Sequence, residues 1–288
     1  MEYRTRDGQT IRANDGQDRL LAALYGSALG RVLIRPLVQP GVSRLIKKLM
    51  STGLSARFVP GFCRSNGIDL ADYRKQVFTS YNDFFIRYIK SGRRPIDPDR
   101  SRLISPCDAK LRAYPISTTA RVRIKQTEYS LSSLLQDENL AARFEGGLLC
   151  IFRLTVDDYH HYSYVEDGEI SGERFIPGLL HTVNPVAEEQ VPIYKTNSRA
   201  YQLLRTHTMG TVLMMEVGAL SIGEICNLHR QTTVKRGEEK GFFAFGGSTV
   251  ILAFQKDRVS LDEDILRNQA EGFETIVKLG ESIGTIVC

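Results

Sequence analysis

The stretch Phe245-Gly246-Gly247-Ser248-Thr249 runs directly into the apolar residues Val250-Ile251-Leu252-Ala253-Phe254. The apolar run is typical of a β-strand. The two glycines allow backbone angles that are closed to other residues and let another group approach the main chain closely. A hydroxyl at Ser248 can therefore lie near the carbonyl of Gly247, and a base that removed its proton would let it attack the backbone. Taken alone, the pentapeptide favours an ordinary turn before a strand.

The sequence pattern changes from helical to β-like near residue 103. Upstream, helices are indicated over residues 42–50 and, in two pieces, over 69–90, after a loose polar arm at 1–18. Downstream, short β-like runs alternate with turns; they are Val122–Ile124, Gly147–Leu154, Thr211–Val217, Val250–Phe254 and Thr275–Val277. We expect an α+β protein, with a helical, basic N-terminal region over residues 1–100. A mainly antiparallel β sandwich or barrel-like body should follow over residues 101–288.

A partial internal repeat lies within the β-rich region. Residues 234–241 and 277–284 share Val, Lys, Gly, Glu and Gly at the same five places. A strand, a Gly-Glu turn and a second strand used twice predict two similar hairpins in the β body.

Composition excludes several classes of protein. The five cysteines are scattered without a Cys-x-x-Cys pair, so neither a disulfide framework nor a zinc site is indicated, and a reducing cytoplasm fits best. No uncharged apolar run reaches the eighteen residues that a transmembrane helix needs. The net charge is +5, and residues 1–60 hold ten basic and four acidic residues, so the basic surplus lies at the N-terminus.

Residues 42–50 form the clearest amphipathic pattern. Val42, Leu45, Ile46, Leu49 and Met50 fall on one helical face, and the basic residues at 44, 47 and 48 lie opposite. Such a helix can lie in an anionic membrane surface. It can equally pack on the protein and leave its basic face in water. Nucleic acid is a weaker candidate, because no aromatic residues are interleaved with the basic ones.

The candidate bases for Ser248 are few, since the chain has only five histidines. His160 and His161 are adjacent, and histidine is the usual base for a serine nucleophile. An acid normally orients such a histidine. Asp108, in the turn Ser105-Pro106-Cys107-Asp108, is a candidate acid. Each has a structural alternative as a turn cap, a surface residue or a packing residue.

Seven motifs in order make the chain resemble a known family. They are Asn82–Arg87, Arg94–Asp97, Ser105–Asp108, Asp158-Tyr159-His160, Val217–Gly223, Lys235–Glu238 and Gly247-Ser248-Thr249. Together they are similar to the phosphatidylserine decarboxylases, over about residues 80 to 280.

The resemblance implies a proenzyme that cuts itself between Gly247 and Ser248, leaving chains 1–247 and 248–288 associated. Ser248 would be the nucleophile and would become a covalent pyruvoyl group, with Asp108 as the orienting acid and His160 as a histidine of the site. The pyruvoyl ketone would form a Schiff base with the amine of phosphatidylserine, and decarboxylation would yield phosphatidylethanolamine and carbon dioxide. No metal or soluble cofactor would be needed. The expected place is the cytoplasmic side of the cell membrane, peripherally bound, and a homodimer is left open.

Two features leave alternatives open. Many relatives carry a second histidine three residues after the first, where this chain has Ser163, so the base could be His160, His161 or His181. A free amino-acid decarboxylase on the same fold and a non-processing lipid-binding relative are competing functions. An ordinary serine hydrolase is disfavoured because Gly-x-Ser-x-Gly is absent around Ser248.

Overall fold

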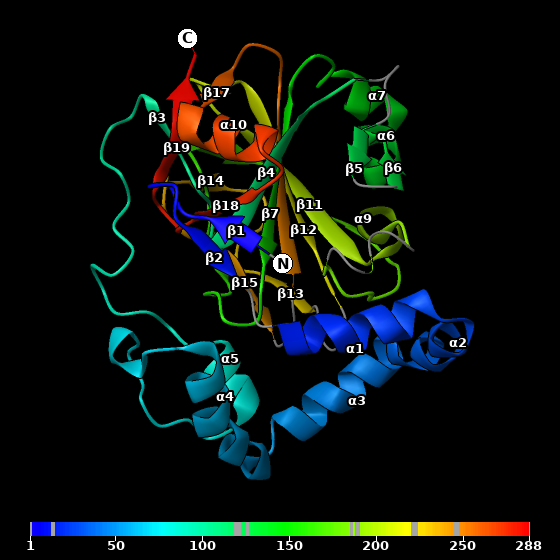
Figure 1. The fold of residues 1–288 in the computed structure, drawn as a ribbon. Helices are drawn as coiled ribbons and strands as arrows, with labels where there is room; N and C mark the ends of the chain where they lie inside the picture. Colours follow the sequence, from blue (N-terminus) through cyan, green and yellow to red (C-terminus); the bar gives the residue numbers. More distant parts are fainter. Residues whose placement is uncertain are drawn as a thin grey trace.

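The computed structural model describes residues 2–12, 15–117, 122–124, 127–184, 187, 191–219, 224–244 and 248–287. Its centre is an open, mostly antiparallel sheet of eleven strands (Figure 1). Its strands, in spatial order, are β14 (Thr233–Val234), β9 (Gly168–Ile170), β11 (Arg199–Arg205), β12 (Thr211–Val217), β16 (Ser248–Phe254), β7 (Leu148–Leu154), β4 (Ala109–Pro115), β18 (Glu274–Val277), β1 (Glu2–Arg4) and β2 (Thr10–Arg12), with β10 (Arg174–Ile176) also on β11.

Three smaller sheets accompany it. They are β13 (Glu224–Asn227), β15 (Glu239–Ala244) and β8 (His161–Ser163); β17 (Val259–Leu261), β19 (Ser282–Ile286) and β3 (Arg102–Ile104); and β5 (Val122–Ile124) with β6 (Thr127–Tyr129). The expected mixture of helices and antiparallel strands is confirmed. The barrel-like expectation is wrong for the part of the chain that the structure describes, because the large sheet runs from β14 to β2 without closing.

The central strands are covered on both faces, which explains their continuous apolar sequences. One face of β7, β12 and β16 packs with β8, β15, β3, β17 and β19 in a single apolar cluster. The other face packs against α6 (Leu131–Leu135) and the end of α7 (Glu138–Ala142). Every residue of β16 is buried, as a strand between two layers requires.

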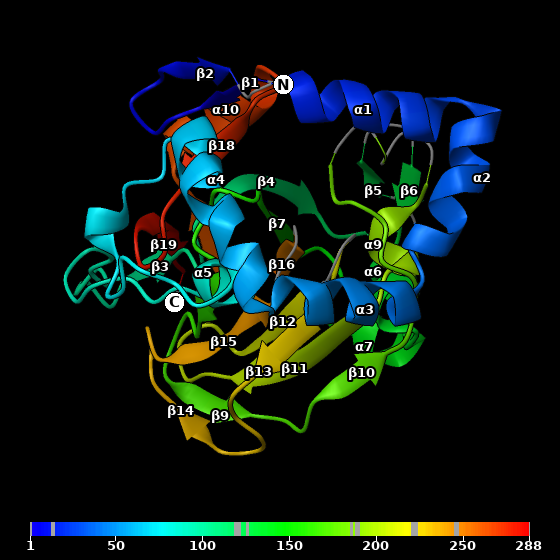
Figure 2. The same ribbon diagram turned by 90° about the horizontal axis from the view of Figure 1, so that it is seen from below.

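The remaining helices lie mainly before the sheet in the sequence. They are α1 (Asp15–Gly26), α2 (Ala28–Leu37), α3 (Pro40–Met50), α4 (Val59–Asn66), α5 (Tyr81–Phe85), α9 (Ile193–Thr196) and α10 (Glu263–Ala270), with short 3₁₀ turns at Gly53–Phe58 and Leu70–Asp72. Figure 1 shows α1 to α5 gathered beyond one end of the strands, with α10 at the opposite end. Figure 2, seen from that helical side, shows α3 crossing the end of the β body, with α1 and α2 along its margin.

Two expectations for the N-terminal region need correction. The polar arm at 1–18 contains β1 and β2, and β1 pairs in parallel with β18 from the far end of the chain. The region is therefore not helical throughout. The helical expectation over 69–90 shrinks to the turn Leu70–Asp72 and the short α5, because residues 74–79 form an irregular connection.

The two repeated segments are not hairpins. The first connects β14 of the large sheet to β15 of a small one, and the second connects β18 of the large sheet to β19 of another. In neither case do the flanking strands pair with each other. Each turn is a corner between sheets, with its glycine in the left-handed region, Gly237 at φ 79° and Gly280 at φ 80°.

Candidate active site

Ser248 and His160 each lie at the end of a stretch that joins the large sheet to the β13–β15–β8 sheet in the sequence. The chain passes from β7 to β8 through residues 155–160, and from β15 to β16 through residues 245–247. The strands on either side of the two stretches are paired. On the large-sheet side Ser248 pairs with Leu154, and on the small-sheet side the Phe243 amide donates to the His160 carbonyl at 2.9 Å. Gly247, the other half of the predicted cleavage site, lies outside the described residues.

Ser248 is fully buried at the start of β16. Its Oγ has no hydrogen-bond partner among the described residues. A buried hydroxyl without a partner costs about 1–3 kcal/mol and is uncommon in a folded protein. The first position of the strand that follows the two glycines thus holds a reactive oxygen that none of the described residues engages.

His160 is fully buried as well, and its ring is held by one hydrogen bond. Nδ1 lies 2.9 Å from the Asp158 carbonyl, which can only accept, so Nδ1 carries the proton. Nε2 is then an acceptor, and it has no partner in the described part of the chain. Burial, followed by the positive charge of Arg87, lowers the pKa of His160 to about 3. The imidazole is thus neutral at physiological pH.

The other two candidate histidines are differently placed. His161 uses both ring nitrogens, with Nδ1 2.6 Å from Glu239 Oε1 and Nε2 3.3 Å from the Ile86 carbonyl, and it stacks on Tyr159. His181 lies on the α1 side, where Nδ1 is 3.3 Å from the Tyr25 hydroxyl and burial lowers its pKa. Of the three, His160 is the one whose free ring nitrogen is buried.

Asp108 is buried directly before β4, and its carboxylate is engaged away from the histidines. Arg94 donates to it from Nε at 2.8 Å and from Nη2 at 2.5 Å, the Leu279 amide donates at 2.9 Å, and Lys278 Nζ lies 3.5 Å away. The structure therefore does not bring Asp108 into a hydrogen bond with His160. Ser163, which stands where many relatives have histidine, donates its amide to Pro106 in the same turn at 2.9 Å.

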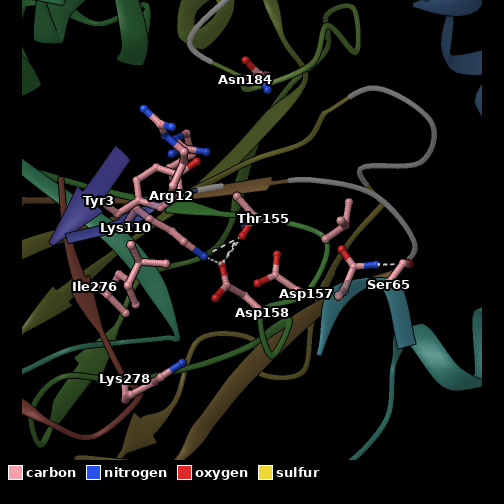
Figure 3. A pocket seen from close by; sticks show the side chains of 14 residues that line it. Tyr3, Arg12, Ser65, Lys110, Thr155, Asp157, Asp158, Asn184, Ile276 and Lys278 are labelled. Carbon is pink, nitrogen blue, oxygen red and sulfur yellow. Dashed lines mark hydrogen bonds and ion pairs between the residues drawn. The ribbon is translucent and has the colours of Figure 1, made fainter. Parts of the chain in front are cut away.

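A cavity of about 430 Å³ lies beside the large sheet, where β7 ends. It is lined by residues of β1, β2, β4, β7, β18, the end of α4 and the 155–158 segment; they include Tyr3, Arg12, Asn66, Lys110, Arg153, Thr155, Asp157, Asp158, Asn184 and Lys278 (Figure 3). Thr155 follows Leu154, the strand partner of Ser248, so the cavity lies at the Ser248 end of β16.

Charged groups of both signs meet in this cavity. Lys110 Nζ donates to Asp158 Oδ2 at 2.6 Å and to Thr155 Oγ1 at 2.6 Å (Figure 3). Burial opposes both charges, yet their mutual attraction prevails, so the pKa of Lys110 is raised and that of Asp158 is lowered. Arg153 is neutralised by Glu274 in the same way, and burial again opposes the charge. The cavity suits a ligand that carries both anionic and cationic groups.

Sequence reasoning did not assign a role to Lys110, Arg153 or Arg87. Arg153 carried a usable signal, because a cation within the apolar run of β7 must find a buried partner. Lys110 gave a weaker one, as a charged residue in an alternating strand. Arg87 stood in a quoted motif without an assigned task.

The fold and the site define an enzyme with a buried serine and a neutral histidine at the junction of two sheets. The sequence profile of phosphatidylserine decarboxylase matches residues 81–285. Phosphatidylserine decarboxylase proenzyme 2 of Clostridium acetobutylicum is 40% identical to this chain, over 92% of this chain and 91% of that protein. The phosphatidylserine decarboxylase proenzyme of Ruminiclostridium cellulolyticum is 39% identical, over 93% of this chain and 92% of that protein. The phosphatidylserine decarboxylase proenzyme of Clostridium perfringens is 37% identical, over 90% of each chain.

This chain belongs to the phosphatidylserine decarboxylase family.

Proposed function

We propose that the chain is a proenzyme that cuts itself between Gly247 and Ser248 and then decarboxylates phosphatidylserine to phosphatidylethanolamine and carbon dioxide. The observation that carries the proposal is that Ser248 Oγ and His160 Nε2 are both buried polar atoms without partners in the described part of the chain. Ser248 is the first residue after one connection between the two sheets, and His160 is the last residue of the other connection. A nucleophile and a base are the two groups that the first step needs.

Self-processing begins with transfer of the Ser248 hydroxyl proton to His160 Nε2. The oxygen attacks the Gly247 carbonyl carbon, the Gly247–Ser248 C–N bond breaks, and the departing amine takes the proton, so an ester replaces the amide. A base then removes the Cα proton of Ser248, and the ester C–O bond breaks to release the upstream chain with a Gly247 carboxylate. Water hydrolyses the resulting dehydroalanine and ammonia leaves, which gives a pyruvoyl group at residue 248.

The buried, unengaged position of Ser248 fits a group of this kind, which supplies an electron sink for loss of carbon dioxide. The chain's own residues would bind and orient the lipid headgroup in the cavity beside Thr155. A serine headgroup bears a phosphate, a carboxylate and an ammonium group. Lys278 and Arg12 offer cations to the anionic groups, and Asp157 offers a carboxylate to the ammonium group.

We assign Asp108 a positioning role. Its carboxylate joins the start of β4 to residues 278–279 and to Arg94. The start of β4 lies next to the end of β7, which Thr155 follows. Asp108 would thereby act on the site through the corner that it holds, and His160 would serve as the base.

The N-terminal helices support docking on a membrane. Large apolar side chains are exposed along α2, α3 and the following turn; they are Leu29, Val32, Leu33, Leu37, Leu45, Leu49, Leu54 and Phe58. Lys47 of α3 instead turns toward the body and pairs with Glu224, and Arg44 and Lys48 stay exposed. Apolar side chains with adjacent cations suit an anionic bilayer surface. No helix among the described residues has the length and apolarity to cross a bilayer.

The activity is tested with vesicles of phosphatidylserine labelled with ¹³C in the serine carboxyl group. The processed protein should release ¹³CO₂ from these vesicles and leave phosphatidylethanolamine. Free [¹³C-carboxyl]serine should give no release. Release from free serine alone would favour the amino-acid decarboxylase, and release from neither would contradict the proposal.

A further inference from the structure

Arg87 is a buried cation whose partners are all uncharged. Its side chain is 2% exposed, and its guanidinium donates to the carbonyls of Phe84 at 3.4 Å, Asp157 at 3.2 Å and Asp158 at 3.1 Å. It lies over the rings of Tyr73 and Phe84. Within the described ranges no carboxylate lies at ion-pair distance from it. Burying a charge without a counter-ion costs several kcal/mol, so its retention calls for a use.

One carbonyl connects Arg87 to the catalytic histidine. The Asp158 carbonyl accepts from Arg87 Nη2 at 3.1 Å and from His160 Nδ1 at 2.9 Å. The direction of that carbonyl decides where the Nδ1 proton is held, and hence which nitrogen is the acceptor. Arg87 therefore fixes the group that sets the tautomer of His160.

The same segment also touches the ring itself. Phe85, two residues before Arg87, packs on His160 with ring centroids 4.2 Å apart. Residues 84–87 thus hold the 157–160 segment by its carbonyls and by its imidazole. After burial, the charge of Arg87 is the next largest cause that lowers the pKa of His160.

We propose that Arg87 is a positioning residue for self-cleavage, which holds the Asp158 carbonyl so that His160 keeps its proton on Nδ1 and presents Nε2 toward the reacting serine. This inference rests on the proposed function, in which His160 is the base. It concerns a residue that acts on the reaction through the 157–160 segment.

The test compares Arg87→Met and Arg87→Lys with Arg74→Met as the matched control. Arg74 also donates to a carbonyl, that of Ile89 at 3.2 Å, and lies over the Tyr88 ring, but among the described residues it donates to no carbonyl of residues 157–160. Self-cleavage of freshly synthesised full-length chain is followed by gel. In parallel, the ¹⁵N shifts of His160 report its tautomer in uncleaved Ser248→Ala protein, with assignment by His160→Gln.

We expect Arg87→Met to slow cleavage by about tenfold or more, as loss of a tautomer-fixing partner does elsewhere. Its His160 should lose the pure Nδ1–H tautomer, whereas Arg74→Met should match the wild type in both readouts. Arg87→Lys keeps the charge but cannot reach both carbonyls, and it should cleave more slowly than the wild type while remaining folded. If Arg87→Met does not fold, the lysine variant decides.

A folded Arg87→Met or Arg87→Lys that cleaves at the wild-type rate with an unchanged tautomer would overturn the inference. Equal slowing in Arg74→Met would do the same, because it would indicate a general effect on packing. Failure of the wild-type chain to cleave would instead contradict the proposed function, so the two failures are distinguishable.

Discussion

Asp108 and Asp167 occupy equivalent places in two copies of one corner. The Leu279 amide donates to Asp108 Oδ1 at 2.9 Å, and the Arg236 amide donates to Asp167 Oδ1 at 2.8 Å. A lysine lies beside each carboxylate, Lys278 at 3.5 Å and Lys235 at 3.4 Å. The two repeats therefore share a hydrogen-bond pattern, although the strands around them do not form hairpins.

The corner at Asp108 lies beside the candidate site, and the one at Asp167 does not, which makes the second a control. We expect Asp108→Asn to reduce self-cleavage strongly, because the substitution weakens the contacts between the start of β4 and residues 278–279. Asp108→Asn should also cost about 3–5 kcal/mol of unfolding free energy, as a broken buried pair does. Asp167→Asn should cost below about 1 kcal/mol, because Asp167 is partly exposed. Gel assays and urea unfolding measure both; equal loss of cleavage in the two variants would contradict this account.

The depressed pKa of His160 predicts a pH dependence of stability. Burial, followed by the Arg87 charge, lowers its pKa to about 3, whereas an unfolded histidine has a pKa of about 6.5. The unfolded chain therefore binds the proton first. The stabilising contribution is complete above pH 6.5 and is lost as the pH falls from there toward 3.

In a Ser248→Ala background, this contribution should decrease by about 2 kcal/mol between pH 7.5 and pH 5, since one pKa unit is worth about 1.4 kcal/mol. Urea unfolding at the two pH values measures it as the difference between that protein and the same protein with His160→Gln. An identical pH dependence in both proteins would show that His160 is not buried in its neutral form.

The Lys110–Asp158 pair should behave as one unit. Lys110→Met leaves a buried carboxylate unpaired and should cost about 3–5 kcal/mol of unfolding free energy. Adding Asp158→Asn should recover a large part of that loss, because the uncompensated charge disappears. A double-mutant cycle by chemical denaturation measures the coupling. Simple additivity of the two single losses would refute the pairing.

The exposed apolar side chains of α3 should support vesicle binding. Leu45 is 59% exposed and Leu49 is 58% exposed, and a fully buried leucine is worth about 1.5–3 kcal/mol. Replacing both by serine should weaken sedimentation with phosphatidylserine vesicles by about tenfold or more, even with partial burial in lipid. Leu266 on α10, 46% exposed at the opposite end of the molecule, provides the control substitution to serine (Figure 1). Equal binding by all three proteins would exclude α3 as the docking element.

Local sequence was sufficient where a strand carries its own signal. β12 was predicted with its observed bounds, and β7 and β16 nearly so, because continuous apolar runs identify strands covered on both faces. β1 was missed because its three residues are unremarkable. It becomes a strand by pairing with β2 and with β18, which lies some 270 residues later in the sequence.

The candidate site likewise contains residues that the sequence alone could identify and residues that it could not. Ser248 and His160 could be chosen from their chemistry and their motifs. Arg87 and Lys110 could not be given roles, because those roles depend on the 155–160 segment, which folding brings to them. The motif position already favoured His160 over His161 and His181, and the hydrogen bonds of the three rings add a physical reason for the same choice.

The most direct measurement is the intact mass of the purified chain beside that of Ser248→Ala. The account predicts two species from the wild type, residues 1–247 and residues 248–288, with the smaller one carrying a pyruvoyl group in place of an amino terminus. The variant should remain a single chain of 288 residues. A single full-length species from the wild type as well would contradict self-processing at Ser248.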